Sequence, residues 1–275
     1  MYNQKKPQLS KGQGLISILV LINHKLFRMK KIYFLLIVIL LSSNIFAQEI
    51  IAFNPIIVDE DDTEAYEKNN KEYIVKLAQD AVDEKYISGW ILLKKMHGEL
   101  FPDNDVNYIL VSGFESINQL LTRPEWWNKS EEKFGIPIDL ISNNNMEWKE
   151  IELYNTQNQI LSEGEGKFVI LNWAKPNNMS KMLEIQNKVE NHFKKNMNKY
   201  GMTGWGFATA IAPQGKNFST ALFWDVYDSF EGVLSHLNNQ AVNIGIADNI
   251  KNEFNQIVPD GWDSRVIFQI IATTK

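Results

Sequence analysis

The chain has 275 residues, of which 28 are basic and 33 acidic, and it contains no cysteine. The first 47 residues hold seven of the basic residues and none of the acidic ones, so residues 48–275 carry a net charge of −12. Such an acidic chain repels phosphate backbones, which argues against nucleic-acid binding. The lack of cysteine excludes disulfides, so the hydrophobic core must supply the stability.

Residues 1–47 are predicted to be a leader and signal peptide. Met29-Lys30-Lys31, the expected start, forms a positive region before an unbroken apolar run at residues 32–41. A short polar stretch then ends at Ala47, where we expect cleavage. The run is too short for a membrane-spanning helix, which needs about 20 residues. We therefore expect a periplasmic or secreted protein without membrane contact after cleavage, with an uncleaved anchor as the alternative.

The first half of the remaining chain, residues 48–154, is predicted to follow the order strand, helix, strand, strand, helix, strand. Alternating apolar residues indicate the strands, and three- and four-residue apolar spacing indicates the helices. Polar, glycine-containing residues 155–166 are predicted to be a linker. The expected strands are residues 50–53, 89–96, 106–114 and 150–154, and the expected helices are residues 63–84 and 116–121.

The second half, residues 167–275, repeats that order. Asn177 to Ser180 supply capping residues for a long amphipathic helix, and Asp228-Ser229 is a good cap for a shorter one. The long helix buries Met182, Ile185, Val189, Phe193 and Met197. The expected strands are residues 167–173, 205–211, 220–226 and 265–272.

The two halves also repeat each other in sequence. Ser88-Gly89-Trp90 in the first half corresponds to Thr203-Gly204-Trp205 in the second, with the tryptophans 115 residues apart. Phe114-Glu115-Ser116 corresponds in the same way to Tyr227-Asp228-Ser229. Solenoid repeats are about 20–50 residues long, so this longer period indicates two copies of one domain. The predicted fold class is α+β, with two tandem ferredoxin-like β-α-β-β-α-β domains packed as an α/β barrel.

Large and small residues alternate along residues 205–211, which indicates two different sheet faces. Trp205, Phe207 and Trp90 are expected on the face that the other half covers. The small residues Gly206, Ala208 and Ala210 are expected either to let a helix pack closely or to leave room for a ligand, and close packing is the preferred interpretation.

The duplicated Gly-Trp strand, the hairpin ends and the long first helix resemble the dimeric α/β-barrel superfamily in its fused tandem form. The resemblance covers residues 48–275 and implies that one chain forms a monomeric pseudo-dimer. That superfamily includes cofactor-free oxygenases, haem peroxidases and lactone isomerases. In some members a helical histidine holds haem iron, and His192 is the matching candidate. The polar residues around His192 are typical of a solvated flank, so no cofactor is expected.

No metal-ligand cluster, phosphate-binding loop or Ser/His/Asp motif occurs in the sequence. Asn172, equivalent to Asn54, could orient a carbonyl or an oxyanion, or it could bond the backbone at a strand end. His192 and His236 are the other weak catalytic candidates. The candidate ligand-binding residues are aromatic: Trp90, Trp173, Trp205, Phe207, Trp224 and Tyr227.

Three functions remain open at this point. The first is an exported barrel protein that binds a small apolar or aromatic molecule between its halves. The second is a cofactor-independent oxygenase or isomerase that uses Asn172, Trp205 and a histidine. The third is a structural or protein-interaction module in which Trp126 and Trp127 make the contact. These two tryptophans mark the point where the copies differ most, because the second half has none there.

Overall fold

The computed structural model describes residues 49–100, 105–141, 146–161 and 166–275. The predicted leader and signal peptide, residues 1–47, lie outside the described residues and stay predictions. Within the described ranges, no helix combines the length and the apolar composition that crossing a membrane requires.

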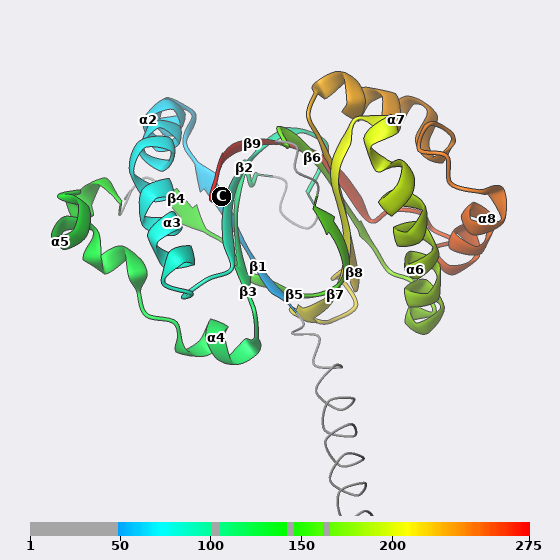
Figure 1. Cartoon of the computed structure of the whole chain (residues 1–275), viewed down its shortest axis with the longest axis horizontal. Coiled ribbons are helices and arrows are strands. Elements are labelled where there is room, and N and C mark those ends of the chain that lie inside the picture. The colour runs from blue at the N-terminus through cyan, green and yellow to red at the C-terminus, as the bar shows by residue number, and fades with distance from the viewer. Residues whose placement is uncertain (1–48, 101–104, 142–145, 162–165) are drawn as a thin grey trace, which may run out of the picture. The chain divides into compact units, whose positions relative to one another are not determined.

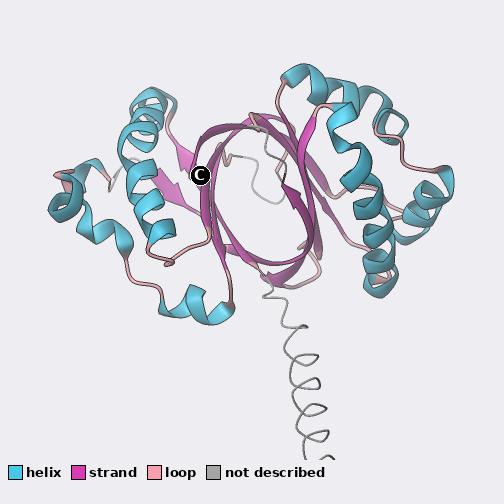
Figure 2. Cartoon of the chain, viewed as in Figure 1, coloured by secondary structure: helices cyan, strands magenta, loops and turns pink. Residues whose placement is uncertain are grey.

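Strands of both halves form one closed antiparallel barrel (Figure 1, Figure 2). The ring runs β5-β1-β3-β2-β9-β6-β8-β7 and returns to β5. Within each half the strands keep the ferredoxin-like order. The pairs β2–β9 and β5–β7 join the edge strands of one half to those of the other and so close the barrel. The barrel strands are β1 (Ile50–Val58), β2 (Gly89–His97), β3 (Tyr108–Phe114), β5 (Glu152–Leu161), β6 (Phe168–Ala174), β7 (Met202–Ala212), β8 (Ala221–Tyr227) and β9 (Ser264–Thr273). The short strand β4 (Met146–Trp148) pairs with the end of β1.

The prediction that residues 155–161 belong to a linker is wrong. Strand β5 continues through them to Leu161, and residues 155–161 pair with β7 from Thr209 to Gly204. The segment is rich in Asn and Gln, a composition typical of linkers, but pairing with β7 satisfies its backbone donors and acceptors. This pairing closes the barrel, which a sequence pattern for one isolated domain does not indicate.

Helices lie outside the barrel on both sides, as predicted. The predicted long helix at residues 63–84 is one continuous rod made of α2, a π-helical turn and α3. Ser116 and Asn178 cap α4 and α6, each accepting a bond from a backbone N–H three residues on. The helix α8 was not predicted. The helices are α2 (Thr63–Asn69), α3 (Val75–Asp83), α4 (Ile117–Thr122), α5 (Ser130–Phe134), α6 (Met179–Asn196), α7 (Phe230–Asn243) and α8 (Asp248–Ile257), and the π turn is Asn70–Ile74. Short 3-10 turns lie at Glu60–Asp62, Trp126–Lys129, Ile138–Leu140 and Met197–Tyr200.

The two faces of the sheet are assigned the opposite way to the prediction. Trp90, Trp205 and Phe207 pack under the helices of their own half, not against the other half. Ala208 and Ala210 instead face the barrel interior. A Cβ on Gly206 would lie 1.9 Å from the ring of Trp224, so the glycine makes room for that indole and not for a helix. Alternation correctly indicated two faces, but it does not say which face meets the helices.

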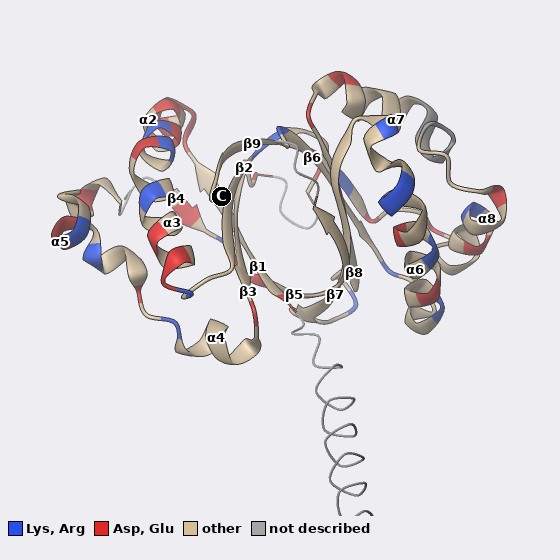
Figure 3. Cartoon of the chain, viewed as in Figure 1, with Lys and Arg blue, Asp and Glu red and all other residues tan. Residues whose placement is uncertain are grey.

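Three apolar clusters hold the fold together. One lies under the helices of each half, and the third lies on the inner face of the barrel and draws residues from both halves, including Phe53, Leu93, Leu171 and Phe268. The charged residues lie largely on the helices and loops, while the barrel strands carry few of them (Figure 3).

Candidate functional site

The second half contains a cavity of about 410 Å³ between the outer face of its strands and the helices α6, α7 and α8. We call it the second-half cavity. Its size lies within the range of about 300–1,000 Å³ that is typical of small-molecule sites. Its lining comprises Asn172, Ile185, Gln186, Val189, Phe193, Trp205, Phe223, Asp225, His236, Ile244, Ile246, Ile250, Lys251, Phe254, Asn255, Val258, Gly261, Trp262 and Arg265.

Aromatic side chains form the walls of this cavity. Phe223 lies 5.2 Å from Trp262 and 6.1 Å from Phe254, both edge-on, measured between ring centroids. On the other side, Phe193 of α6 lies 5.5 Å from Trp205 of β7. Helix α8 positions Phe254, so the helix that the sequence analysis missed supplies one wall. These edge-on and tilted rings make the walls of the cavity largely apolar.

A chain of polar side chains forms the floor of the cavity. Arg265 on β9 donates from Nε to Asn172 Oδ1 at 2.5 Å, and Asn172 on β6 donates from Nδ2 to Asp225 Oδ2 on β8 at 3.1 Å. Asn172 is 1% exposed and Asp225 is 7% exposed. Burial lowers the pKa of Arg265, and the nearby Asp225 opposes that shift. The guanidinium also lies over the ring of Trp262, 5.3 Å from its centroid.

His236 and Tyr227 form a second buried polar pair beside this floor. The Tyr227 hydroxyl and His236 Nδ1 share a hydrogen bond whose donor depends on the histidine tautomer. Burial lowers the pKa of His236; Asp225 opposes that shift and Arg265 adds to it. Burial also raises the pKa of Tyr227, so that its phenol keeps its proton. Burial therefore favours the neutral form of the His236 imidazole in this cavity.

The structure brings three of the predicted residues to this one cavity: Asn172, Trp205 and His236. Phe207 and Tyr227 pack in the same apolar cluster. The other predicted ligand-binding residues lie elsewhere. Trp90 is under the helices of the first half, while Trp173 and Trp224 belong to the barrel interior.

Sequence reasoning missed Asp225 and Arg265, although each left a signal. Asp225 is an acid inside the apolar strand Ala221–Tyr227, and Arg265 opens an equally apolar strand. A charge in such a strand is expected to have a partner, since burying it unpaired is costly. The partner could not be identified because β6 lies between these two strands in the sheet.

His192, the haem-ligand candidate, does not fit that role. Its Nε2 lies 2.8 Å from the carbonyl oxygen of Ile244, and its Nδ1 lies 3.5 Å from the Asn196 amide. The ring therefore ties α6 to the chain after α7, and it does not line the second-half cavity. Among the described residues, no group of three or more histidine and acidic side chains could hold a metal ion.

The first half has an equivalent cavity of about 680 Å³, the first-half cavity. The strand registers align Asn54 with Asn172, Ser112 with Asp225 and Trp90 with Trp205. Asn54, however, donates to the Leu110 carbonyl at 3.2 Å, which is the structural role weighed for these asparagines. The lining comprises Asn54, Tyr66, Asn69, Asn70, Ile74, Trp90, Leu110, Ser112, Arg123, Trp126, Trp127, Asn128, Ile138, Leu140, Ile141, Met146 and Trp148.

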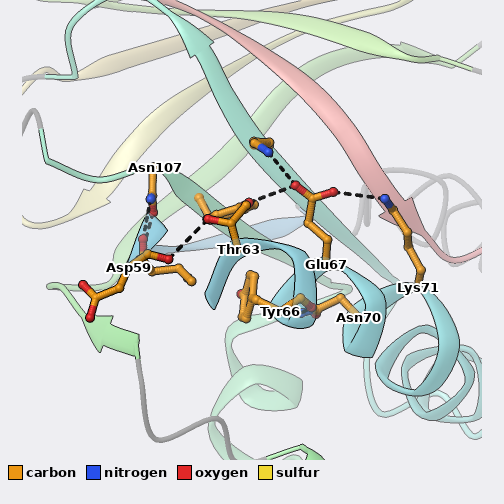
Figure 4. Close-up of polar contacts among 10 residues, drawn as sticks. Asp59, Thr63, Tyr66, Glu67, Asn70, Lys71 and Asn107 are labelled. Carbon is orange, nitrogen blue, oxygen red and sulfur yellow. Dashed lines mark hydrogen bonds and ion pairs between the residues drawn. The ribbon is translucent and has the colours of Figure 1, made fainter. Parts of the chain in front are cut away.

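One wall of the first-half cavity is held by the contacts of α2 shown in Figure 4. Asn70 donates to the Tyr66 carbonyl at 2.9 Å, and both residues line the cavity. On the same helix, Glu67 accepts bonds from Lys94 at 2.6 Å and from Lys71 and Tyr108 at 3.0 Å. Burial raises the pKa of Glu67, but these three bonds outweigh it and lower the pKa overall. The charged carboxylate thus fastens α2 to β2 and β3.

No protein-family model matches this chain, and no curated protein matches it in sequence. Its structure is similar to that of a proposed monooxygenase from Lactobacillus acidophilus, with a TM-score of 0.50 and 13% identity over 83% of this chain and 96% of that chain. A proposed monooxygenase from Fusobacterium nucleatum gives a TM-score of 0.48 and 13% identity over 84% and 96% of the two chains. A chlorite dismutase from Candidatus Nitrospira defluvii gives 0.44 and 6% over 81% and 90%. At such low identity the likeness shows the fold alone, that of the ferredoxin-like dimeric α/β-barrel proteins.

Proposed function

We propose that the second-half cavity binds a small aromatic or other apolar molecule that carries an uncharged polar group, such as a ketone or phenol oxygen. The observation that carries this proposal is the combination of aromatic walls with the buried Arg265–Asn172–Asp225 floor. The opposite charges of Arg265 and Asp225 balance, so the floor offers hydrogen bonds without demanding a charged ligand. The expected location between the two halves is revised to a location within one half.

Intrinsic fluorescence titration with neutral ketones and phenols of two and three fused rings tests this proposal. Asn255 of α8 is exposed and lines the cavity, so Asn255→Trp is expected to obstruct it with little effect on folding. The affinity of the Asn255→Trp variant for any ligand found is expected to fall by about tenfold or more, which corresponds to a loss of about 1.4 kcal/mol in binding free energy. Asn252→Trp places the same indole on α8 at a position that does not line the cavity.

Loss of ligand binding in Asn255→Trp, together with normal binding in Asn252→Trp, supports binding in the second-half cavity. Equal binding by both variants, or no ligand from the whole series, contradicts it.

A second candidate function, a cofactor-independent oxygenase, rests on the convergence of Asn172, Trp205 and His236 on the same cavity. A neutral His236 could remove a proton from an aromatic substrate with an acidic CH₂ group. The resulting carbanion would reduce O₂, and the balanced reaction converts CH₂ and O₂ to a ketone and water. Oxygen uptake with such substrates tests it, and uptake that persists in His236→Gln would contradict the assigned role of this histidine.

We also propose export to the periplasm or the medium, which rests on the pattern of residues 29–47. Sequencing the N-terminus of the protein from its native cells tests this. A mature chain that begins at Gln48 supports it, and an N-terminus at or before Met29 contradicts cleavage.

A further inference from the structure

The first-half cavity differs from the second-half cavity in its balance of charge. Where the second-half cavity has the acid Asp225, the strand register places Ser112 in the first half. Of the described residues that line the first-half cavity, none is acidic and one, Arg123, is basic. Arg123 therefore brings a positive charge to this cavity without an opposite charge among the described lining residues.

Arg123 is held at the cavity by contacts that do not neutralise it. Its guanidinium lies over the ring of Phe114, 5.1 Å from the centroid, and it donates to the carbonyl oxygen of Leu120. Arg123 is exposed at one side, and partial burial of its guanidinium lowers its pKa. A guanidinium has five N–H donors in a planar fork that suits carboxylate, phosphate and other anionic groups, so Arg123 can pair with an anion bound here.

A buried donor in the same cavity lacks a partner. Trp90 is 1% exposed and lines the cavity, and its indole N–H has no hydrogen-bond partner among the described residues. An unpaired buried N–H costs about 1–3 kcal/mol, and a ligand that supplies an acceptor would recover that cost. The half-buried pair Trp126 and Trp127, 5.4 Å apart and edge-on, adds apolar surface for the body of such a ligand.

We propose that the first-half cavity is a second binding site, selective for an apolar or aromatic molecule that carries an anionic group, with Arg123 as the partner of the anion. The two halves would then have diverged in charge preference. The second-half cavity takes neutral polar ligands, and the first-half cavity takes organic anions. Trp126 and Trp127, at the point where the copies differ most, belong to this site.

Two probes that share one aromatic body test the proposal. These are 1-anilinonaphthalene-8-sulfonate, which is an anion, and N-phenyl-1-naphthylamine, which lacks the sulfonate. Fluorescence titrations use the full chain with Asn255→Trp as background, so that the second-half cavity is obstructed. Arg123→Gln is expected to lower the affinity for the sulfonate probe by about tenfold or more, because a charge-assisted hydrogen bond is lost. The affinity for the neutral probe is expected to change by less than about threefold. Arg123→Lys, which keeps the charge, is expected to bind the sulfonate with intermediate affinity.

Lys129→Gln provides the matched control, because Lys129 is exposed, lies six positions along the chain and does not line the cavity. Lys129→Gln is expected to leave both affinities unchanged. If Arg123→Gln and Lys129→Gln lower the affinity for the sulfonate probe equally, the loss comes from surface charge alone, and the proposal is overturned. Equal losses of both probes in Arg123→Gln would also overturn it. Sulfonate binding that disappears on introducing Asn255→Trp alone would assign the anion to the second-half cavity and overturn it as well.

Discussion

At the scale of single residues, the two cavities show how one fold acquires two chemistries. Asp225 and Ser112 occupy the same register position, and so do Tyr227 and Phe114 at the ends of their strands. In the second half these positions hold an acid, Asp225, and a phenol that keeps its proton and shares a hydrogen bond with His236. In the first half they hold a serine and a phenylalanine, so the charge of Asp225 has no equivalent there. A few substitutions on one face of a strand therefore decide whether a cavity is charge-balanced.

The pH dependence of stability is predicted to report on His236. Its pKa is lowered by burial, so the folded state keeps it neutral while the unfolded state gains a proton near the ordinary value of about 6.5. Stability is therefore complete above that value and falls as the pH drops through it toward the folded-state pKa. In His236→Gln the loss of unfolding free energy between pH 7.5 and 5.5 should be smaller than in the wild type, as measured by urea denaturation.

The exposed His97 offers a control for this measurement. His97→Gln should keep the pH dependence of the wild type. If His236→Gln instead loses stability to the same extent as the wild type between the two pH values, the buried neutral imidazole is contradicted.

At the scale of elements, alternation along the strands was informative but incomplete. It correctly indicated that residues 205–211 form a strand with a large and a small face. It could not show that Trp205 and Phe207 meet α6 and its neighbours while Ala208 and Ala210 meet the opposite half. Both environments are apolar, so the pattern on one strand is the same in either orientation. For a related reason the sequence pattern predicts too short a strand at β5 and does not predict α8. Residues that are distant in the sequence stabilise both elements.

Gly206 gives a test of the packing between strands in the barrel. A Cβ at this position would lie 1.9 Å from the Trp224 ring, so Gly206→Ala must displace a large, partly buried indole. We expect a loss of about 1–3 kcal/mol in unfolding free energy, the usual cost of overpacking. Gly89→Ala is the matched control, because a Cβ there meets nothing within 4 Å. It should be neutral, or stabilising by up to about 1 kcal/mol because the unfolded chain loses freedom. Equal effects of the two substitutions in chemical denaturation would contradict this packing.

At the scale of the whole molecule, the repeat was the most reliable sequence signal. It predicted two ferredoxin-like domains in one chain, and the described structure has this architecture. The candidate site was predicted less completely. Asn172, Trp205 and His236 were named from type and position, but Asp225, Arg265 and the walls from α8 depend on strand order and helix placement. Neither can be derived from residue types alone.

The shared barrel interior predicts that the two halves unfold together. Strands β2 and β9 pair across the halves, as do β5 and β7, and the central apolar cluster draws on both. Separating the halves would expose four strand edges and this cluster to water, which is costly. Calorimetry should therefore show one transition with equal calorimetric and van't Hoff enthalpies.

Two substitutions test this prediction: Leu92→Ala in the first half and Ile267→Ala in the second. Each residue lies in the core under the helices of its own half, and each substitution should lower the midpoint of that one transition. Truncation of a buried Leu or Ile costs about 2–5 kcal/mol, enough for a shift of several degrees. Two resolved transitions, with each substitution moving a different one, would show that the halves are independent and that closure of the barrel contributes little to stability.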